Sequence, residues 1–278
     1  AVLGTLDNVH VPDQLSRRRA SPLQDVLRSL WCGEGTTIDP GVILADFHRH
    51  IPDMKGRGSK QQDMSVMFQA IVKDYLEGEV QKLFDFEYLS WCRCPLDRCD
   101  KESYKFDPAR SLQVELHEGC NTLESLLDHH VRPGPIEWKH DCKSDVEPKP
   151  RLNGEKTLSV SSYPEILVVQ LKRFKFSRAN NISTRVDTKI KYPAQLDYYR
   201  NPDQSYRLVA VGRHVGHIDN GHYFAWVRYG NDWWRCSDSL VTPIPNFSTD
   251  MDDGGRAYML FYKRIDDGGC GGGGGGMR

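Results

Sequence analysis

The spacing of apolar residues changes from a helical to a strand period near residue 80. Before that point apolar side chains recur three and four positions apart, the spacing of one face of a helix. Three segments show this pattern, at 21–30, 40–48 and 63–79. Ser21 is a suitable N-cap and Pro22 fits a first helical turn, which strengthens the first of them. We therefore predict three helices in this part of the chain.

Beyond residue 80 short strand-like runs replace the helical pattern. The run 166–171 is apolar except at Gln170, as in a strand covered on both faces. The other strands are expected at 82–90, 104–106, 111–116, 206–211, 222–229, 232–236 and 257–263. One short helix is expected at 122–130. Helices followed by a mostly antiparallel sheet with a cysteine-bearing insertion indicate the α+β class.

The two ends of the chain lack such patterns. Residues 1–20 show no clear periodicity and contain three adjacent arginines, so we expect an irregular segment. Residues 268–276 are nearly all glycine, so we expect a flexible tail over 266–278.

Composition narrows the function classes. The chain has 278 residues, with 37 Lys and Arg against 38 Asp and Glu, a formal charge of -1. Such a balance gives no field directed at nucleic acid or an anionic membrane. No apolar run is long enough for a bilayer, and no secretory signal pattern is present, so we expect an intracellular protein of cytoplasm or nucleus with neither nucleic-acid nor membrane partners. The eight cysteines then suggest metal binding, catalysis or burial more than disulfides.

A histidine and an acid bracket two of the expected strands. Gly221 and His222 open an alternating apolar run, and Ser237 and Asp238 follow two tryptophans about fifteen residues later. One interpretation is a surface hairpin with an ordinary hydrogen-bonded histidine. The other is a catalytic base and its orienting group on neighbouring strands.

Four motifs, in this order and spacing, resemble the ubiquitin-specific protease family of papain-like deubiquitinases. They are KQQD at 60–63, YPEILVVQLKRF at 163–174, the histidine motif from Tyr206 to Tyr223, and the closing strands at 234–241 and 257–262. The resemblance implies a papain-like cysteine protease fold over 21–265. It would comprise a helical thumb at about 21–80, β fingers at about 81–150 and an antiparallel β palm at about 151–265.

The resemblance also implies roles in a substrate cleft. His222 would serve as base and then acid, beside a thiol whose pKa the imidazole lowers. Gly221 would leave room for the narrow Gly-Gly tail of ubiquitin, next to Tyr223. Gln62 and Asp63 would line the cleft near the oxyanion.

The orienting residue departs from the family pattern. Ser237 stands where the family has Asn or Asp, and the second acid of the pair is Asp238. A serine accepts a hydrogen bond from imidazole but stabilises an imidazolium less well than a carboxylate does. We expect Asp238 to turn inward and orient the ring, with Ser237 as the other candidate.

The family's cysteine motif, GLxNxGNTCYxNSxLQ, has no match in residues 1–60. In one register residues 21–24 are the end of that motif, Arg17 or Ser16 replaces the nucleophile, and the chain is an inactive relative. In the other register residues 22–31 are a later thumb helix and the motif precedes Ala1. The distance from Pro40 to Gln61 favours the second register. Cys32 is interpreted as a buried apolar residue, since a helix C-terminus disfavours a thiolate.

Cysteines also cluster in the expected fingers. Compared with a CxxC pair, Cys94 and Cys99 lie further apart in the sequence, and His140 and Cys142 lie closer together. Three thiolates and an imidazole would complete a closed tetrahedral structural zinc site, and Cys92 could replace any of the thiols. The alternative is a degenerate site of reduced thiols. No catalytic cofactor is expected.

Two further functions remain as alternatives. A non-catalytic module that binds ubiquitin or ubiquitinated proteins, or a scaffold, is the main alternative to thiol-dependent isopeptide hydrolysis. A catalytic zinc held by His214, His217 and His222 is the weaker one. Strand alternation is expected to turn His214 and His222 to one face, but no nearby Glu has the spacing of zinc hydrolases.

Overall fold

The computed structural model describes residues 40–51, 63–76, 78–96, 99–138, 153–177, 182–197, 204–217 and 221–265. Several expectations lie outside these residues: the helix at 21–30, both chain ends, Cys32, Gln62, His140 and Cys142. Among the described helices, none has both the length and the apolar character needed to cross a membrane.

The described thumb consists of short helices. They are α2 (Pro40–His50), α3 (Met64–Ala70), the π-helix η4 (Ile71–Tyr75) and α4 (Glu79–Lys82). The prediction of one helix over 63–79 holds as far as Tyr75, with a change from α to π geometry at Ile71. It is wrong beyond that point, because Leu76 is extended and Gly78 adopts φ +60°. The strand expected from residue 82 starts later, at Phe86, since Lys82 still belongs to α4.

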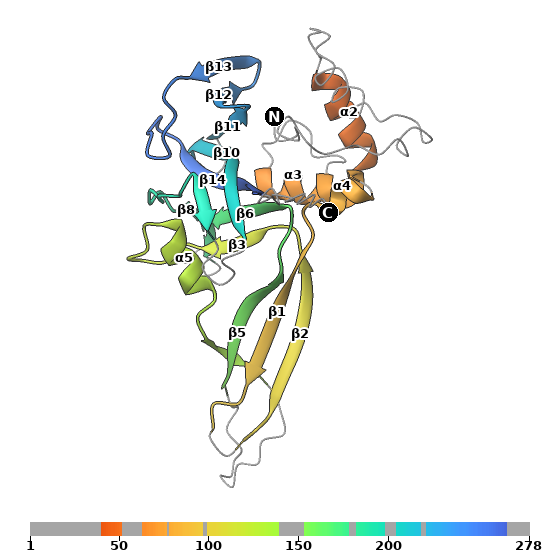
Figure 1. The fold of residues 1–278 in the computed structure, drawn as a ribbon, viewed down its shortest axis with the longest axis vertical. Helices are drawn as coiled ribbons and strands as arrows, with labels where there is room; N and C mark the ends of the chain where they lie inside the picture. The colour runs from red at the N-terminus through yellow and green to blue at the C-terminus, as the bar shows by residue number, and fades with distance from the viewer. Residues whose placement is uncertain are drawn as a thin grey trace, which may run out of the picture.

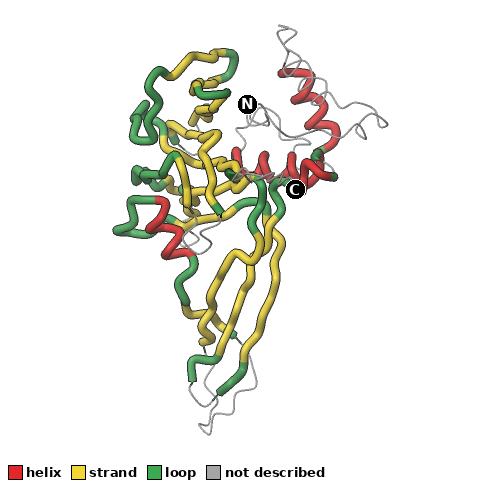
Figure 2. The backbone as a smooth tube through the Cα atoms, in the orientation of Figure 1, coloured by secondary structure: helices red, strands yellow, loops and turns green. Residues whose placement is uncertain are grey.

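Four strands form a long, narrow finger sheet that extends away from the rest of the molecule (Figure 1; yellow in Figure 2). Their order is β2 (Glu102–Ala109), β1 (Phe86–Arg93), β5 (Asn153–Ser162) and β4 (Gly134–Glu137). Strand β5 pairs with β1 along nearly its whole length, although its residues fall in the range expected for the palm. Strand β4 carries Gly134 and Pro135 and was not expected, because these residues are typical of a break between elements.

An eight-stranded palm sheet holds the core. Its order is β13-β12-β11-β10-β14-β6-β3, with β9 paired to β10. The bounds are β3 (Leu112–Glu115), β6 (Ile166–Lys172), β9 (Gln195–Asp197), β10 (Ser205–Gly216), β11 (Gly221–Tyr229), β12 (Asp232–Ser237), β13 (Leu240–Ile244) and β14 (Arg256–Arg264). Strands β3 and β6 pair in parallel and the other neighbours are antiparallel. A separate hairpin joins β7 (Phe174–Ser177) to β8 (Ile182–Arg185).

Both faces of the palm sheet are covered, as the apolar run of β6 predicts. Leu167 and Val169 belong to a cluster that includes the buried leucines of α5 (Leu123–His130). Val168 points the other way, into a cluster against which Met64 and Phe68 of α3 pack. Helix α5 begins as expected, with Thr122 as its N-cap. Mainly antiparallel sheets with a few separate helices confirm the α+β class.

Candidate active site

His222 lies at the start of β11 and contacts Ser237 at the end of the neighbouring strand. Cα pairing joins Val215 to His222 across β10 and β11, and Ala225 to Cys236 across β11 and β12. The Nε2 atom of His222 lies 2.7 Å from the hydroxyl oxygen of Ser237. The imidazole is 41% exposed, so one nitrogen is held and the ring still reaches solvent. The structure therefore brings the expected base together with a neutral partner.

We expected Asp238 to turn inward, but it does not. Its carboxylate Oδ2 lies 3.9 Å from Nε2 of His222, and its side chain is 84% exposed. The backbone of Asp238 has φ +49°, a left-handed conformation that directs this turn residue away from the strand. Ser237, the last residue of regular β12, keeps strand geometry and so points at the ring.

Asp63 joins the thumb to the palm. Its Oδ1 accepts hydrogen bonds from the backbone N–H groups of Ser65 at 2.8 Å and Val66 at 3.1 Å, which caps α3. Its Oδ2 accepts from the hydroxyl of Tyr258 at 2.6 Å and lies 3.5 Å from that of Tyr223. Burial and then the Asp63 carboxylate raise the pKa of both tyrosines, so both hydroxyls stay protonated donors. Both carboxylate oxygens of Asp63 are thus engaged within the protein.

Two residues of this junction were not identified as site residues from the sequence. The amide Nε2 of Gln170 donates to the hydroxyl oxygens of Ser65 at 2.8 Å and Tyr258 at 3.0 Å. Gln170 is buried, and its signal in the sequence is that it is the one polar residue in the apolar run 166–171. Tyr258 carries no such signal, because a tyrosine in a strand of apolar residues is also typical of plain core packing.

Gly221 and His214 are packed against each other. A Cβ atom on Gly221 would lie 2.2 Å from Nε2 of His214 and 2.6 Å from the carbonyl oxygen of His217. Glycine is therefore required here by the fold, whether or not a ligand passes close to the backbone. His214 is buried, and the guanidinium of Arg185 lies 3.0 Å from its Nδ1.

The buried ring of His214 is neutral at physiological pH. Burial lowers its pKa to about 4, and the adjacent Arg185 lowers it as well. Because the guanidinium is a donor, Nδ1 accepts and the proton sits on Nε2. That Nε2 is buried, and none of the described residues forms a hydrogen bond with it.

The expectation that His214 and His222 share a face is wrong. His214 pairs with Tyr223, so these two residues lie on one face of the sheet and His222 lies on the other. Counting residues along the chain fails here because the pairing register across the hairpin, not the sequence separation, sets the faces. This arrangement disfavours the three-histidine zinc alternative.

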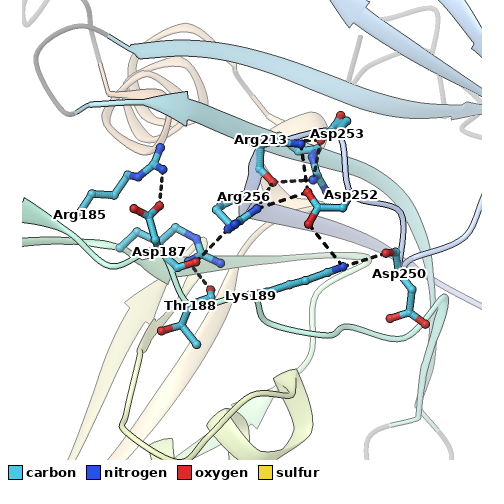
Figure 3. A network of polar contacts seen from close by, with 12 residues as sticks. Arg185, Asp187, Thr188, Lys189, Arg213, Asp250, Asp252, Asp253 and Arg256 are labelled. Atoms are coloured by element: carbon cyan, nitrogen blue, oxygen red, sulfur yellow. Dashed lines mark hydrogen bonds and ion pairs between the residues drawn. The ribbon is translucent and has the colours of Figure 1, made fainter.

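A network of ion pairs fixes the segment that carries Arg185 (Figure 3). Arg185 pairs with Asp187, and the guanidinium of Arg256 donates to the carbonyl oxygen of Asp187 at 2.9 Å. Lys189 donates to the carbonyl oxygen of Asp250 at 2.9 Å. The loop before β14 thereby holds the segment after β8, and with it the Arg185 side chain beside His214.

The described cysteines do not supply a nucleophile near His222. Three of the five lie at or just beyond the end of β1 in the fingers, and Cys120 precedes α5. Cys236 adjoins Ser237 but, by strand alternation, faces the opposite side of β12, and burial raises the pKa of its thiol. A raised pKa disfavours the thiolate that the chemistry needs.

Two of the expected zinc ligands lie at the fingertips. Cys94 and Cys99 both line a hollow of about 690 Å³, and Cys92 is not among its lining residues. Within the described residues, no group of three or more His, Cys, Asp or Glu side chains is arranged to hold a metal ion. His140 and Cys142, the other expected ligands, lie outside the described residues.

Structural comparison places the fold. A chain of the Ubp8-Sgf11-Sgf73-Sus1 SAGA DUB module aligns with a TM-score of 0.67 at 22% identity, covering 88% of this chain and 56% of that one. A second structure of the SAGA DUB module, with Ubp8, Sgf11, Sus1 and Sgf73 bound to monoubiquitin, aligns with a TM-score of 0.65 at 24% identity, covering 81% and 52%. The expected papain-like fold of thumb, palm and fingers is confirmed.

Sequence comparison agrees. The probable ubiquitin carboxyl-terminal hydrolase 8 of Schizosaccharomyces pombe is 29% identical over 191 residues, covering 62% of this chain and 39% of that protein. Ubiquitin carboxyl-terminal hydrolase 10 of Arabidopsis thaliana is 30% identical over 284 residues, covering 95% and 29%. The chain thus spans less than two fifths of the length of either relative. Residues 7–262 match the family described as ubiquitin carboxyl-terminal hydrolase, and the chain belongs to that family.

Proposed function

We propose that this chain binds ubiquitin and provides the histidine of a thiol-dependent hydrolase that cleaves isopeptide bonds to the ubiquitin C-terminus. The observation that best supports this proposal is the 2.7 Å contact between Nε2 of His222 and the hydroxyl of Ser237. This contact holds the ring by one nitrogen and leaves Nδ1 for a second partner. An imidazole held in this way is what a general base requires.

The reaction then divides into two stages, and in each stage His222 takes up a proton and gives it back. A thiol supplied from outside the described residues gives its proton to Nδ1, and the thiolate attacks the carbonyl carbon of the isopeptide bond. The imidazolium returns that proton to the lysine nitrogen, which leaves as an amine. In the second stage the ring takes a proton from water as it attacks the thioester carbon, and it returns that proton to the sulfur as the C–S bond breaks.

Ser237 orients the ring without adding charge. A hydroxyl accepts from Nε2–H, but it does not stabilise the imidazolium as a carboxylate would. The Asp238 carboxylate at 3.9 Å compensates weakly, because it is 84% exposed and screened by water. We therefore expect slower chemistry than in a family member with a carboxylate at the position of Ser237.

The substrate tail is proposed to pass beside Gly221 and Tyr223. Tyr223 is half-buried and faces Asp63 on the thumb, so this contact marks where thumb and palm meet. A diglycine tail is narrow enough for a channel lined by backbone and by the edge of a tyrosine ring.

Titration of the full chain with ubiquitin tests the binding half of the proposal. We expect ubiquitin to bind, and ubiquitin that lacks its last two glycines to bind about ten-fold more weakly, measured by calorimetry. The ten-fold figure corresponds to about 1.4 kcal/mol of contact with the tail. Equal affinities for the two forms, or no binding of either, would contradict the proposal.

The main alternative is a module that binds ubiquitin without chemistry. The positions of the five described cysteines favour it, because none of them is placed as a partner for His222 among the described residues. Incubation with ubiquitin carrying a C-terminal propargyl amide separates the two functions. A covalent adduct in wild-type chain that His222→Ala abolishes supports the hydrolase. Binding without an adduct is the outcome we expect of this chain by itself, because the proposed hydrolase takes its thiol from outside the described residues; the chain by itself then acts as the module.

We also propose one structural zinc ion at the fingertips, held by Cys94, Cys99, His140 and Cys142. The support is that Cys94 and Cys99 line one hollow, and thiolates are the preferred ligands of such sites. Elemental analysis should find one zinc per chain, and Cys99→Ser should lose it while Cys236→Ser retains it. Chain purified without zinc, or zinc retained by Cys99→Ser, would overturn this proposal.

A further inference from the structure

The β12–β13 turn carries exposed apolar side chains next to the candidate base. Leu240 is 57% exposed and Val241 is 56% exposed, immediately after Asp238 and Ser239. Their strand, β13, is the last of the palm sheet in the described part of the chain, so its outer edge has no neighbouring strand there. Exposed apolar side chains at a sheet edge lower solubility, and such a patch is typical of a contact surface.

The pairing register places Leu240 on the same face as His222. Leu240 is the Cα partner of Ser237, whose hydroxyl contacts the His222 ring, so Leu240 and Ser237 project from the same side. Val241 is the partner of Cys236 and projects from the opposite side. Two side chains of nearly equal exposure thus differ in whether they face the base.

The sheet separates the two sides of the scissile bond, which are the ubiquitin tail and the acceptor lysine. Strand β11, which carries His222, has β10 on one side and β12 and β13 on the other. Tyr223 on the proposed tail path pairs with His214 of β10 and projects from the face of the sheet opposite to His222, and Asp63 of the thumb lies on the face of Tyr223. Figure 1 shows β12 and β13 at the end of the molecule opposite the fingers. The acceptor lysine leaves on the side of His222 that is away from the ubiquitin tail. It therefore meets the β12–β13 turn.

We propose that Leu240 is a specificity-determining residue that contacts the side-chain methylenes of the acceptor lysine in the isopeptide bond. A lysine offers four methylenes next to the scissile nitrogen, and an exposed leucine is a complementary surface for them. The Asp238 carboxylate beside it is exposed and suits the amine that is released. This inference rests on the proposed function, since it requires a ubiquitin tail at His222.

Two ligands and two matched variants test it in the full chain. The ligands are free ubiquitin and ubiquitin joined by a triazole to the lysine side chain of a short peptide, a linkage that a thiol does not hydrolyse. In wild-type chain we expect the conjugate to bind about five-fold more tightly than free ubiquitin, the gain from burying part of a leucine. Leu240→Ser should reduce this gain to less than two-fold, and Val241→Ser should keep it.

Affinity for free ubiquitin is the internal control for folding, and it should be the same in all three proteins. If the conjugate binds no more tightly than ubiquitin, or if Val241→Ser removes the gain as fully as Leu240→Ser, the assignment of Leu240 is overturned while the proposed function stands. If neither ligand binds the wild-type chain, the proposed function itself has failed, and this inference fails with it.

Discussion

The hydroxyl oxygen of Ser237 lies 2.7 Å from Nε2 of His222, so a neutral group orients the candidate base. If the hydroxyl accepts from Nε2–H, the ring is held in the tautomer whose Nδ1 is free to take a proton. A carboxylate would hold the same tautomer and add charge. The single hydroxyl therefore selects the tautomer without stabilising the imidazolium by charge.

Ring ¹⁵N chemical shifts measured by NMR would report this tautomer. In wild-type chain at pH 8 we expect the His222 signals to show the proton mainly on Nε2. Ser237→Ala should give shifts averaged between both tautomers, because no group then selects one nitrogen. Ser239→Ala, an exposed serine in the same turn, is the matched control and should leave the pattern unchanged. A proton found mainly on Nδ1 in the wild type would contradict the proposed orientation.

The junction between Asp63 and Tyr258 should couple the thumb to the palm energetically. Asp63→Ala removes both the cap of α3 and the acceptor of the 2.6 Å bond from Tyr258, and we expect it to destabilise the fold by about 2–3 kcal/mol. Asp63→Asn keeps an oxygen for the cap and should cost about half as much. Urea denaturation measures both values.

A double-mutant cycle with Tyr258→Phe isolates that contact. Because each single change already breaks the same hydrogen bond, the combined loss in Asp63→Ala with Tyr258→Phe should fall short of the sum by about 1 kcal/mol. Strict additivity would mean that the two side chains do not stabilise each other.

The sequence predicted those parts of the fold in which local pattern and global role agree. The apolar run 166–171 became buried strand β6, and residues 122–130 became α5 with its Thr122 cap. The place of His222 at the start of a strand was also predicted, because a Gly-His pair before an alternating apolar run is a local signal. Each of these features depends on neighbours in the chain.

Features set by pairing or backbone geometry were not predictable in this way. The opposite faces of His214 and His222 follow from the register of β10 on β11, which residue counting does not give. The outward position of Asp238 follows from its φ of +49°, which no propensity of the surrounding turn indicates. Gly78 likewise divides an otherwise regular helical pattern. The fold class was therefore easier to predict than the direction of a given side chain.

Gly221→Ala should be strongly destabilising. The added Cβ would lie 2.2 Å from Nε2 of His214 and 2.6 Å from a backbone oxygen, so the hairpin has to shift. We expect a loss of about 2–3 kcal/mol in the free energy of unfolding, typical of overpacking. Thermal and urea denaturation of the same preparations would measure it.

Gly134→Ala provides the comparison for that change. A Cβ at Gly134 meets no atom within 4 Å, so its cost should stay within about 0.5 kcal/mol. Similar losses for the two variants would mean that the close approach of His214 to Gly221 does not constrain the hairpin.

His214 should make the fold less stable in acid. Burial, with a contribution from Arg185, lowers its folded-state pKa to about 4, whereas an unfolded histidine titrates near 6.5. Between these values the unfolded chain binds a proton that the folded chain does not, so the stability present above pH 6.5 is lost as pH falls towards 4. We expect this group to account for up to about 3 kcal/mol of that loss.

Urea denaturation at several pH values should show a shallower decline of the unfolding free energy in His214→Gln than in the wild type, whatever the absolute stability of the variant. His217→Gln, at an exposed position, should keep the wild-type slope, and an unchanged slope in His214→Gln would show that the buried ring is not the titrating group.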